Sequence, residues 1–290
     1  MTKWLMQSSG FSSKNIEKSF NAMKRLNLKF DDFGLIPFTN RVTNLENCLE
    51  EDLNTVYVIK GGTKLLKVLN EVNTLKEMDE NIYENLNKNS NIYIESLKAG
   101  IDYSFKNFDL NYYKELNLPL LNQDARYMPY EEVKNEKFKT KKFIKPSRDL
   151  KAFNGGIMGE DITIEEFIKN NQCQDFFKEE TIVINDLKTI YAEYRFFIIG
   201  EDIITYSQYM RGNRLILDSN VPDFIIDSAK EYAKLYKPAE IFVMDLADTD
   251  QGIKIIEYNC WNASGLYECN VMKLFNEVNE YKKEQYAKNK

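Results

Sequence analysis

Two predicted β-hairpins in the C-terminal half constrain the fold of this chain more than any other feature. One spans 192–210 and turns at Gly200 and Glu201, and the other spans 239–259 and turns at the sequence DTDQG. Apolar and aromatic runs joined by short polar or glycine-containing turns are typical of antiparallel strands. Between the hairpins, apolar residues recur at helical spacing over 222–237. We therefore expect antiparallel strands and an amphipathic helix in this half.

Two upstream regions alternate predicted strands with helices. Residues 1 to about 95 contain a β-branched run that stops at two glycines, with Thr63 as the expected N-cap of the helix that follows. A second such region begins near 136. Its predicted helix over 163–171 opens with Thr163 and Glu166 at the spacing of a capping box. This alternation predicts an α/β fold class, with α+β lobes.

The segment between these regions is less regular. Residues 79–91 are polar and rich in asparagine, so we expect a loop there. Residues 91–96, with the sequence NIYIES, are expected to form a strand. Prolines at 119 and 129 indicate a connector.

Composition narrows the possible chemistry. The 290 residues are enough for two or three structural units. A net charge of −6 argues against nucleic acid as the main partner, because nucleic-acid binders usually carry a basic face. The chain contains no histidine, which excludes imidazole bases, Ser–His and Cys–His catalysis and His-ligated zinc. An enzyme built from this sequence must work with carboxylates, Lys, Arg, amides and a hard metal ion.

The sequence also bears on the compartment. It has neither a signal-peptide pattern at its start nor a run of about 18 apolar residues, so we expect a cytoplasmic protein that does not span a membrane. Its four cysteines show no CxxC spacing, which indicates free thiols in a reducing compartment. Nothing in the sequence determines the oligomeric state.

Three oxygen-bearing side chains are expected to converge at the end of the second hairpin. Asp245 ends one apolar strand, and Glu257 and Asn259 end the other. Residues two apart on a strand share a face, so both carboxylates and the amide can meet. Mg²⁺ takes such oxygen ligands and would relieve the repulsion between the two acids. The alternative is a solvated hairpin that carries scattered acids.

A lysine strand and a glycine-containing loop form a second candidate site. Lys145 lies on an otherwise apolar strand, where an unpaired ammonium is costly and a phosphate is a natural partner. The following loop carries Arg148, Lys151, Gly155 and Gly156, which offer cations and close backbone approach to an anion. The spacing is not that of a Walker loop. An ordinary β-turn is the alternative interpretation.

The first hairpin carries a third candidate pair. Glu193 and Arg195 share one face of their strand. They are consistent with a structural salt bridge on a sheet, or with an arginine that stabilises transferring phosphoryl oxygens.

The order of these signals along the chain resembles that of the ATP-grasp superfamily. The sequence FIKPSRD at 143–149 is similar to the lysine strand of D-alanine–D-alanine ligases, and 243–259 is similar to the paired metal strands of the family. The stretches 193–209 and 257–267 are closer to a phage and bacterial clade of carboxylate–amine ligase-like ATP-grasp proteins. The resemblance covers about 115–275.

This resemblance implies two lobes that sandwich ATP, preceded by a small Rossmann-like α/β domain. The implied boundaries are 1–114 for the N-terminal domain and connector, 115–190 for the nucleotide-binding lobe, and 191–290 for the metal-binding and catalytic lobe with a C-terminal helix.

The resemblance also implies roles for individual residues. Lys145 would contact the ATP phosphates, and the loop from Arg148 to Gly156 would close over them, with Lys151 as a second cation. Glu193 would bind the ribose hydroxyls. The implied adenine hinge and the implied Mg²⁺ ligands are, respectively, Asp186, Leu187 and Lys188, and Asp245, Glu257 and Asn259.

Two features set this chain apart from the family pattern. The arginine often found two residues before the metal-binding aspartate is Val243 here, which leaves Arg195 to supply that charge. The hinge sequence is not a clean match. Asn262 and Ser264, just past the metal strand, are expected to line the acceptor pocket and bind a substrate carboxylate or its acyl phosphate.

The implied activity is an ATP- and Mg²⁺-dependent ligase. It would join a small-molecule or peptide carboxylate to an amine, or a thiol, through an acyl phosphate. A small-molecule kinase and a non-catalytic ATP-binding protein that acts as a sensor or inhibitor are the alternatives. Cys260 and Cys269 are expected to be packing residues rather than nucleophiles, because the chain has no histidine to activate them.

Overall fold

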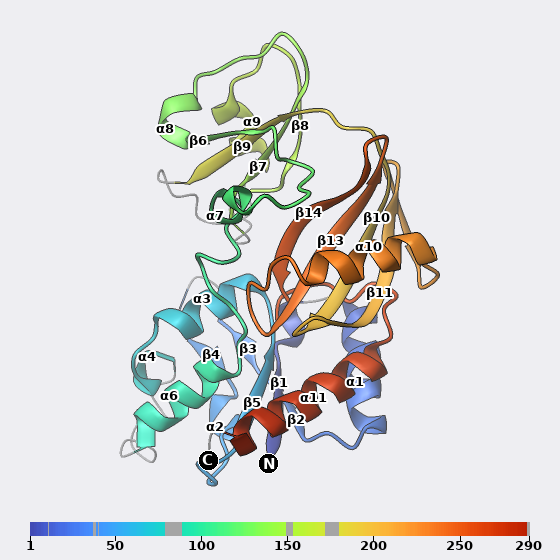
Figure 1. Cartoon of the computed structure of the whole chain (residues 1–290). Coiled ribbons are helices and arrows are strands. Elements are labelled where there is room, and N and C mark those ends of the chain that lie inside the picture. The colour runs from blue at the N-terminus through green and yellow to red at the C-terminus, as the bar shows by residue number, and fades with distance from the viewer. Residues whose placement is uncertain are drawn as a thin grey trace.

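Three β-sheets are stacked along the length of the molecule in the computed structural model (Figure 1). The N-terminal sheet lies at one end, a five-stranded antiparallel sheet lies in the middle, and a four-stranded antiparallel sheet lies at the other end. The structure describes residues 1–10, 12–36, 39, 41–78, 89–148, 153–171 and 180–288.

The helices are α1 (Ser13–Arg25), α2 (Leu45–Cys48), α3 (Thr63–Glu71), α4 (Leu75–Met78), α6 (Ser90–Ala99), α7 (Leu110–Tyr113), α8 (Tyr130–Val133), α9 (Ile164–Asn171), α10 (Asp223–Ala233) and α11 (Val271–Lys288), with short 3-10 helices η1 (Ser8–Gly10) and η3 (Lys114–Leu116). The strands are β1 (Thr2–Met6), β2 (Phe30–Asp32), β3 (Gly34–Leu35), β4 (Val42–Thr43), β5 (Val56–Lys60), β6 (Arg126–Pro129), β7 (Lys142–Pro146), β8 (Gly156–Met158), β9 (Thr181–Asp186), β10 (Ile190–Ile199), β11 (Asp202–Arg211), β12 (Arg214–Asp218), β13 (Ile241–Thr249) and β14 (Gly252–Cys260). In the described part of the chain, no helix combines the length and the apolar character needed to cross a membrane.

The N-terminal sheet is parallel, in the order β2-β1-β5, and is covered by helices on both faces. Leu5 packs with α3 and α6, whereas its neighbours Trp4 and Met6 pack with α1 and α11. Strands buried on both faces read as continuous apolar runs, which is the pattern of these segments. The predicted α/β layer at the N-terminus is confirmed.

Two local predictions in this region are wrong. Residues 91–96 lie in helix α6, because Tyr93, Ile94 and Leu97 recur at helical spacing and turn one face toward the core. Gly62 is the N-cap of α3, with extended backbone, and Thr63 is the first helical residue. The predicted loop at 79–91 lies almost entirely outside the described residues.

The four-stranded sheet has the order β6-β9-β7-β8 and carries the predicted lysine strand at its centre. Helix α9 packs on it through Ile164, Phe167 and Ile168. The capping box is confirmed, because the Thr163 backbone N–H donates to the Glu166 carboxylate over 2.7 Å and the Glu166 N–H donates to the Thr163 hydroxyl over 3.1 Å.

The five-stranded sheet has the order β12-β11-β10-β13-β14, and both predicted hairpins are confirmed in it. Helix α10 covers one face, where Ile225 and Ala229 pack with Phe196 and Met244. The outer edge of β14 is covered by the connector, since the Leu121 N–H donates to the Ile255 carbonyl over 2.8 Å.

The last helix joins the two ends of the chain. Although α11 follows the five-stranded sheet in sequence, it packs against the N-terminal sheet (Figure 1). The Thr2 hydroxyl and the Trp4 indole both donate to the Asn279 side-chain oxygen. The sequence-based boundaries remain a prediction, but α11 belongs by its packing with the N-terminal domain.

The turn after β14 is held by buried hydrogen bonds to the N-terminal domain. The fully buried Asn262 amide donates to the carbonyls of Ile59 and Gly100, and its oxygen accepts from the Asp102 N–H. The buried Lys60 ammonium donates to the carbonyls of Asn262 and Ser264 over 3.0 and 2.7 Å. This turn therefore fixes the N-terminal domain against the five-stranded sheet.

We predict that Asn262→Ala lowers the free energy of unfolding by about 1–3 kcal/mol, because it leaves buried backbone groups without partners. Urea unfolding followed by circular dichroism measures this change. Asn276→Ala, an exposed position on α11, is the control and should leave stability nearly unchanged. Equal stability of the two variants would contradict the structural role of Asn262.

Candidate active site

A cleft of about 900 Å³ lies between the four-stranded and five-stranded sheets. Residues from both sheets, from the 187–189 link between β9 and β10, and from the turn after β14 line it. Its walls combine apolar side chains, such as Phe143 and Ile157, with a small set of charged groups on its floor. Such a combination is typical of small-molecule sites.

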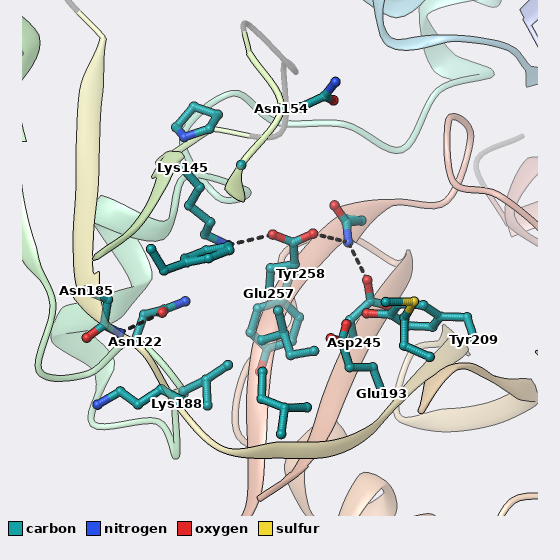
Figure 2. A pocket seen from close by; sticks show the side chains of 18 of the residues that line it. Asn122, Lys145, Asn154, Asn185, Lys188, Glu193, Tyr209, Asp245, Glu257 and Tyr258 are labelled. Atoms are coloured by element: carbon teal, nitrogen blue, oxygen red, sulfur yellow. Dashed lines mark hydrogen bonds and ion pairs between the residues drawn. The ribbon is translucent and has the colours of Figure 1, made fainter. Parts of the chain in front are cut away.

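The predicted convergence of Asp245, Glu257 and Asn259 is observed. Asp245 and Glu257 are register partners on β13 and β14. The Asn259 side-chain amide lies between them and donates to Asp245 Oδ2 over 3.0 Å and to Glu257 Oε1 over 3.2 Å (Figure 2). One donor bridging two carboxylates occupies the kind of position that a cation takes.

A β-bulge aims Glu257 into the cleft. The register shifts between Asp245 and Leu246, which leaves Ile256 as an extra residue on β14. Bulges bend a strand and redirect its side chains, and they recur next to functional sites. Both Ile256 and Glu257 line the cleft as a result.

Lys145 crosses the cleft from the opposite sheet. Its ammonium donates to Glu257 Oε2 over 2.6 Å, so the four-stranded and five-stranded sheets are joined by an ion pair (Figure 2). Lys145 is therefore not the unpaired ammonium that its apolar strand suggested. A Cβ added at Gly155 would lie 2.8 Å from the Lys145 Cβ, so a glycine is required where the loop passes over this strand.

Arg195 is held rigidly beside the acids. Its guanidinium makes two hydrogen bonds to Asp245, from Nε over 2.8 Å and from Nη2 over 2.7 Å. The rings of Tyr209 and Tyr267 lie 5.6 and 4.9 Å from its central carbon. Of the two interpretations of the Glu193 and Arg195 pair, the salt bridge is present, but the partner of Arg195 is Asp245 on the next strand.

The two carboxylates have opposite electrostatic behaviour. Burial raises the pKa of Glu257, but Lys145, Asn259 and Arg195 together outweigh it and bring the pKa down to about 2. Burial raises the pKa of Asp245, against the opposing effect of the Arg195 guanidinium. Glu257 therefore stays ionised near neutral pH and attracts whatever cation enters the cleft.

Glu193 and the hinge residues also line the cleft. Burial raises the pKa of the Glu193 carboxyl, which is hydrogen-bonded to the Tyr209 hydroxyl. Asp186, Leu187 and Lys188 lie at and just after the end of β9, where the chain passes from one sheet to the other. The Asp186 and Lys188 side chains are paired with Lys142 and Asp124, which leaves Leu187 as the exposed apolar residue.

The phosphate-loop predictions have mixed outcomes. Arg148 lines the cleft and pairs with Asp109, with 3.5 Å between Nε and Oδ2. Gly155 lines the cleft, whereas Gly156 begins β8 and is paired with Ile144 away from the lining. Lys151 lies outside the described residues.

The prediction that Asn262 lines the acceptor pocket is wrong. Its side chain is fully buried and bound to backbone of the N-terminal domain, as described above. Ser264 does line the cleft, but its hydroxyl donates to the Cys260 carbonyl over 2.8 Å. Cys260 is a buried residue whose thiol contacts the Asp102 carbonyl, and burial raises the pKa of Cys269 to about 12. Both cysteines are packing residues, as expected.

Several cleft residues were not identified from sequence. The Asn185 amide donates to the Asn122 side-chain oxygen over 2.9 Å at one end of the cleft (Figure 2). Tyr209 and Tyr267 stack at the other end, with ring centroids 4.9 Å apart. Tyr267 adopts a left-handed backbone with φ 46°, which is uncommon for an aromatic residue. None of these residues has a local motif, because they come together only in the tertiary structure.

Comparison with known families decides the identity of this arrangement. Residues 88–278 match the family model of an ATP-grasp domain, the third family of one clade of that superfamily. The chain belongs to this ATP-grasp family. The matched range contains both sheets that form the cleft, together with every described cleft residue named above.

Solved structures support the fold of the whole chain. D-alanine–D-alanine ligase from Bacillus anthracis aligns with a TM-score of 0.55 at 11% identity, over 100% of this chain and 99% of that chain. The same enzyme complexed with ATP gives 0.53 at 14% identity, over 100% of both chains. At these identities the two structures establish the ATP-grasp fold alone. No curated protein sequence matches the chain.

We predict that the stabilising effect of Glu257 is lost in acid. Its pKa of about 2 lies below the ordinary value of 4.5, so its contribution is present above about pH 4.5 and disappears as the pH falls toward 2. The difference in unfolding free energy between wild type and Glu257→Gln should shrink by about 1–2 kcal/mol over this range, a value discounted because the side chain is 35% exposed.

Urea unfolding at a series of pH values measures this difference. Glu201→Gln, at the exposed turn between β10 and β11, is the matched control and should show no comparable trend. A gap between wild type and Glu257→Gln that stays constant down to the lowest pH would contradict the Lys145–Glu257 ion pair.

Proposed function

We propose that this protein is an ATP- and Mg²⁺-dependent ligase that joins a carboxylate to an amine through an acyl phosphate. The observation that carries the proposal is the cluster on the cleft floor, where two cations, two carboxylates and an amide meet between the two ATP-grasp sheets. A carboxylate substrate would attack the γ-phosphorus of ATP and release ADP. An amine would then displace phosphate from the acyl phosphate.

The acidic cluster fits a magnesium ion. In the described part of the chain no group of three His, Cys, Asp or Glu side chains meets the pattern of an all-protein metal site. Two carboxylates and one amide oxygen suit Mg²⁺, which usually takes its other ligands from phosphates and water. Asp245, Glu257 and Asn259 would hold the ion after the Asn259 amide turns its oxygen inward. Bound there, the ion would neutralise charge on the phosphate oxygens.

Nucleotide binding would exchange the partners of Lys145 and Glu257. The ammonium now neutralises Glu257. With nucleotide present, Lys145 would turn to a phosphate and Glu257 would take the metal ion, so each charge keeps an opposite partner. Arg195 would remain bound to Asp245 and keep that carboxylate ionised and oriented. No step of this scheme needs a histidine.

The nucleotide base and ribose have candidate partners elsewhere along the cleft. We assign the adenine to the apolar surface of Leu187, Phe143 and Ile157, beside the backbone of the hinge. Glu193 would accept hydrogen bonds from the ribose hydroxyls. The side chains of Asp186 and Lys188 are occupied by ion pairs, so the hinge would contribute its backbone rather than these groups.

Product analysis tests the proposal. The protein is incubated with ATP, Mg²⁺ and pools of amino acids, polyamines and short peptides, and mass spectrometry identifies the products. A ligase gives ADP, free phosphate and a new amide, and hydroxylamine traps its acyl phosphate. Phosphate that remains on the substrate would make the protein a kinase. Nucleotide binding without turnover in any pool would indicate a non-catalytic ATP-binding protein.

We expect Glu257→Gln to reduce ATP turnover on the order of a hundredfold or more, because the neutral amide loses the charge that holds the metal ion. Steady-state ADP release measures the effect. Glu201→Gln, on the same sheet but away from the cleft, should retain the wild-type rate. Wild-type turnover by Glu257→Gln would overturn the metal assignment.

Lys145→Ala should weaken ATP binding by about 1.5–3 kcal/mol, roughly tenfold to a hundredfold, because a charge-assisted contact is lost from an ordered strand. Lys142→Ala is the matched control, since it lies on the same strand and outside the cleft lining. Isothermal titration calorimetry compares the two. A larger loss for Lys142→Ala would show that Lys145 does not contact the nucleotide.

A further inference from the structure

The two outer edges of the five-stranded sheet differ in protection. The β14 edge is covered by the connector, where Pro119, Leu120 and Leu121 lie against Ile255. Strand β12 forms the other edge, and none of the described strands pairs with its outer side. Unpaired strand edges template pairing with another chain unless they are short, charged or covered.

Strand β12 is also apolar where solvent reaches it. Leu215, Ile216 and Leu217 are 67%, 37% and 38% exposed. The register with β11 shifts so that Ile216 and Leu217 stand opposite the single residue Tyr209. A row of three exposed apolar residues on a sheet edge is unfavourable in an isolated molecule, and Phe224, 56% exposed, follows close behind in the sequence.

The charges at the ends of β12 are arranged symmetrically about Ile216. The strand reads Arg-Leu-Ile-Leu-Asp, from Arg214 to Asp218. Antiparallel to a copy of itself and centred on Ile216, this sequence places each Arg214 opposite the other Asp218 and each Leu215 opposite the other Leu217. An interface around a two-fold axis must be self-complementary in this way.

We propose that two copies of this chain associate through β12, antiparallel and centred on Ile216, to form a dimer. The apolar centre would be buried and two Arg214–Asp218 ion pairs would close its ends. The assembly stops at two because, among the described strands of this sheet, each copy contributes its one unpaired edge and the connector covers the opposite edge. This inference does not depend on the proposed ligase activity.

Charge reversal tests the register of this interface. Arg214→Asp places two aspartates opposite one another, and Asp218→Arg places two arginines opposite one another. Each variant should raise the dimer dissociation constant by at least about tenfold, because attraction becomes repulsion at both ends. Mixed in equal amounts, the two variants restore both ion pairs and should form a heterodimer. The double variant Arg214→Asp/Asp218→Arg should regain the wild-type dissociation constant.

Sedimentation velocity of the full chain, over a concentration series from the low micromolar range upward, measures these constants. Circular dichroism confirms that each variant is folded, and Arg25→Asp on the exposed end of α1 controls for the change in net charge. Ile216→Lys supplies an independent arm and should abolish dimers. A wild-type chain that stays monomeric throughout, reversals that leave the dimer unchanged, or a mixture that does not form a heterodimer would each overturn the proposal.

Discussion

Burial of two neighbouring carboxylates is the constraint on which the centre of this molecule depends. Asp245 is 1% exposed and lies beside Glu257, so each needs a cation or the pair would repel and take up protons. Arg195 on β10 neutralises the first, and Lys145 on β7 neutralises the second. Because β7 belongs to the other sheet, the electrostatic requirement of one acid also sets how the two lobes face each other across the cleft.

The two ion pairs differ in what they permit. Arg195 is buried, makes two hydrogen bonds to Asp245 and is flanked by two tyrosine rings, so its removal would leave an uncompensated buried charge. Lys145 makes one contact to a carboxylate that solvent partly reaches. The first pair is therefore suited to fix the geometry of the floor, and the second is suited to exchange partners when a nucleotide enters.

The N-terminal domain is an integral part of this arrangement. The family match begins at residue 88, yet α11 packs on the N-terminal sheet and the buried Lys60 and Asn262 bind the turn that follows β14. That turn carries Ser264 and Gly265, which line the cleft, and the Gly265 carbonyl accepts from Arg195 over 3.3 Å. Packing in the N-terminal domain thus reaches the floor of the cleft through one turn.

The sequence by itself determined the α/β class, both hairpins, the lysine strand and the convergence of Asp245, Glu257 and Asn259, because these follow from periodicity and from residues close together along the chain. Tertiary structure alone decided the partners of Lys145 and Arg195, since the contacts join strands 112 and 50 residues apart in the sequence. It also decided that Asn262 is a packing residue rather than an acceptor ligand. Its hydrogen-bond partners lie 160 or more residues away, and no local pattern distinguishes an amide that faces a cleft from one that closes a domain interface.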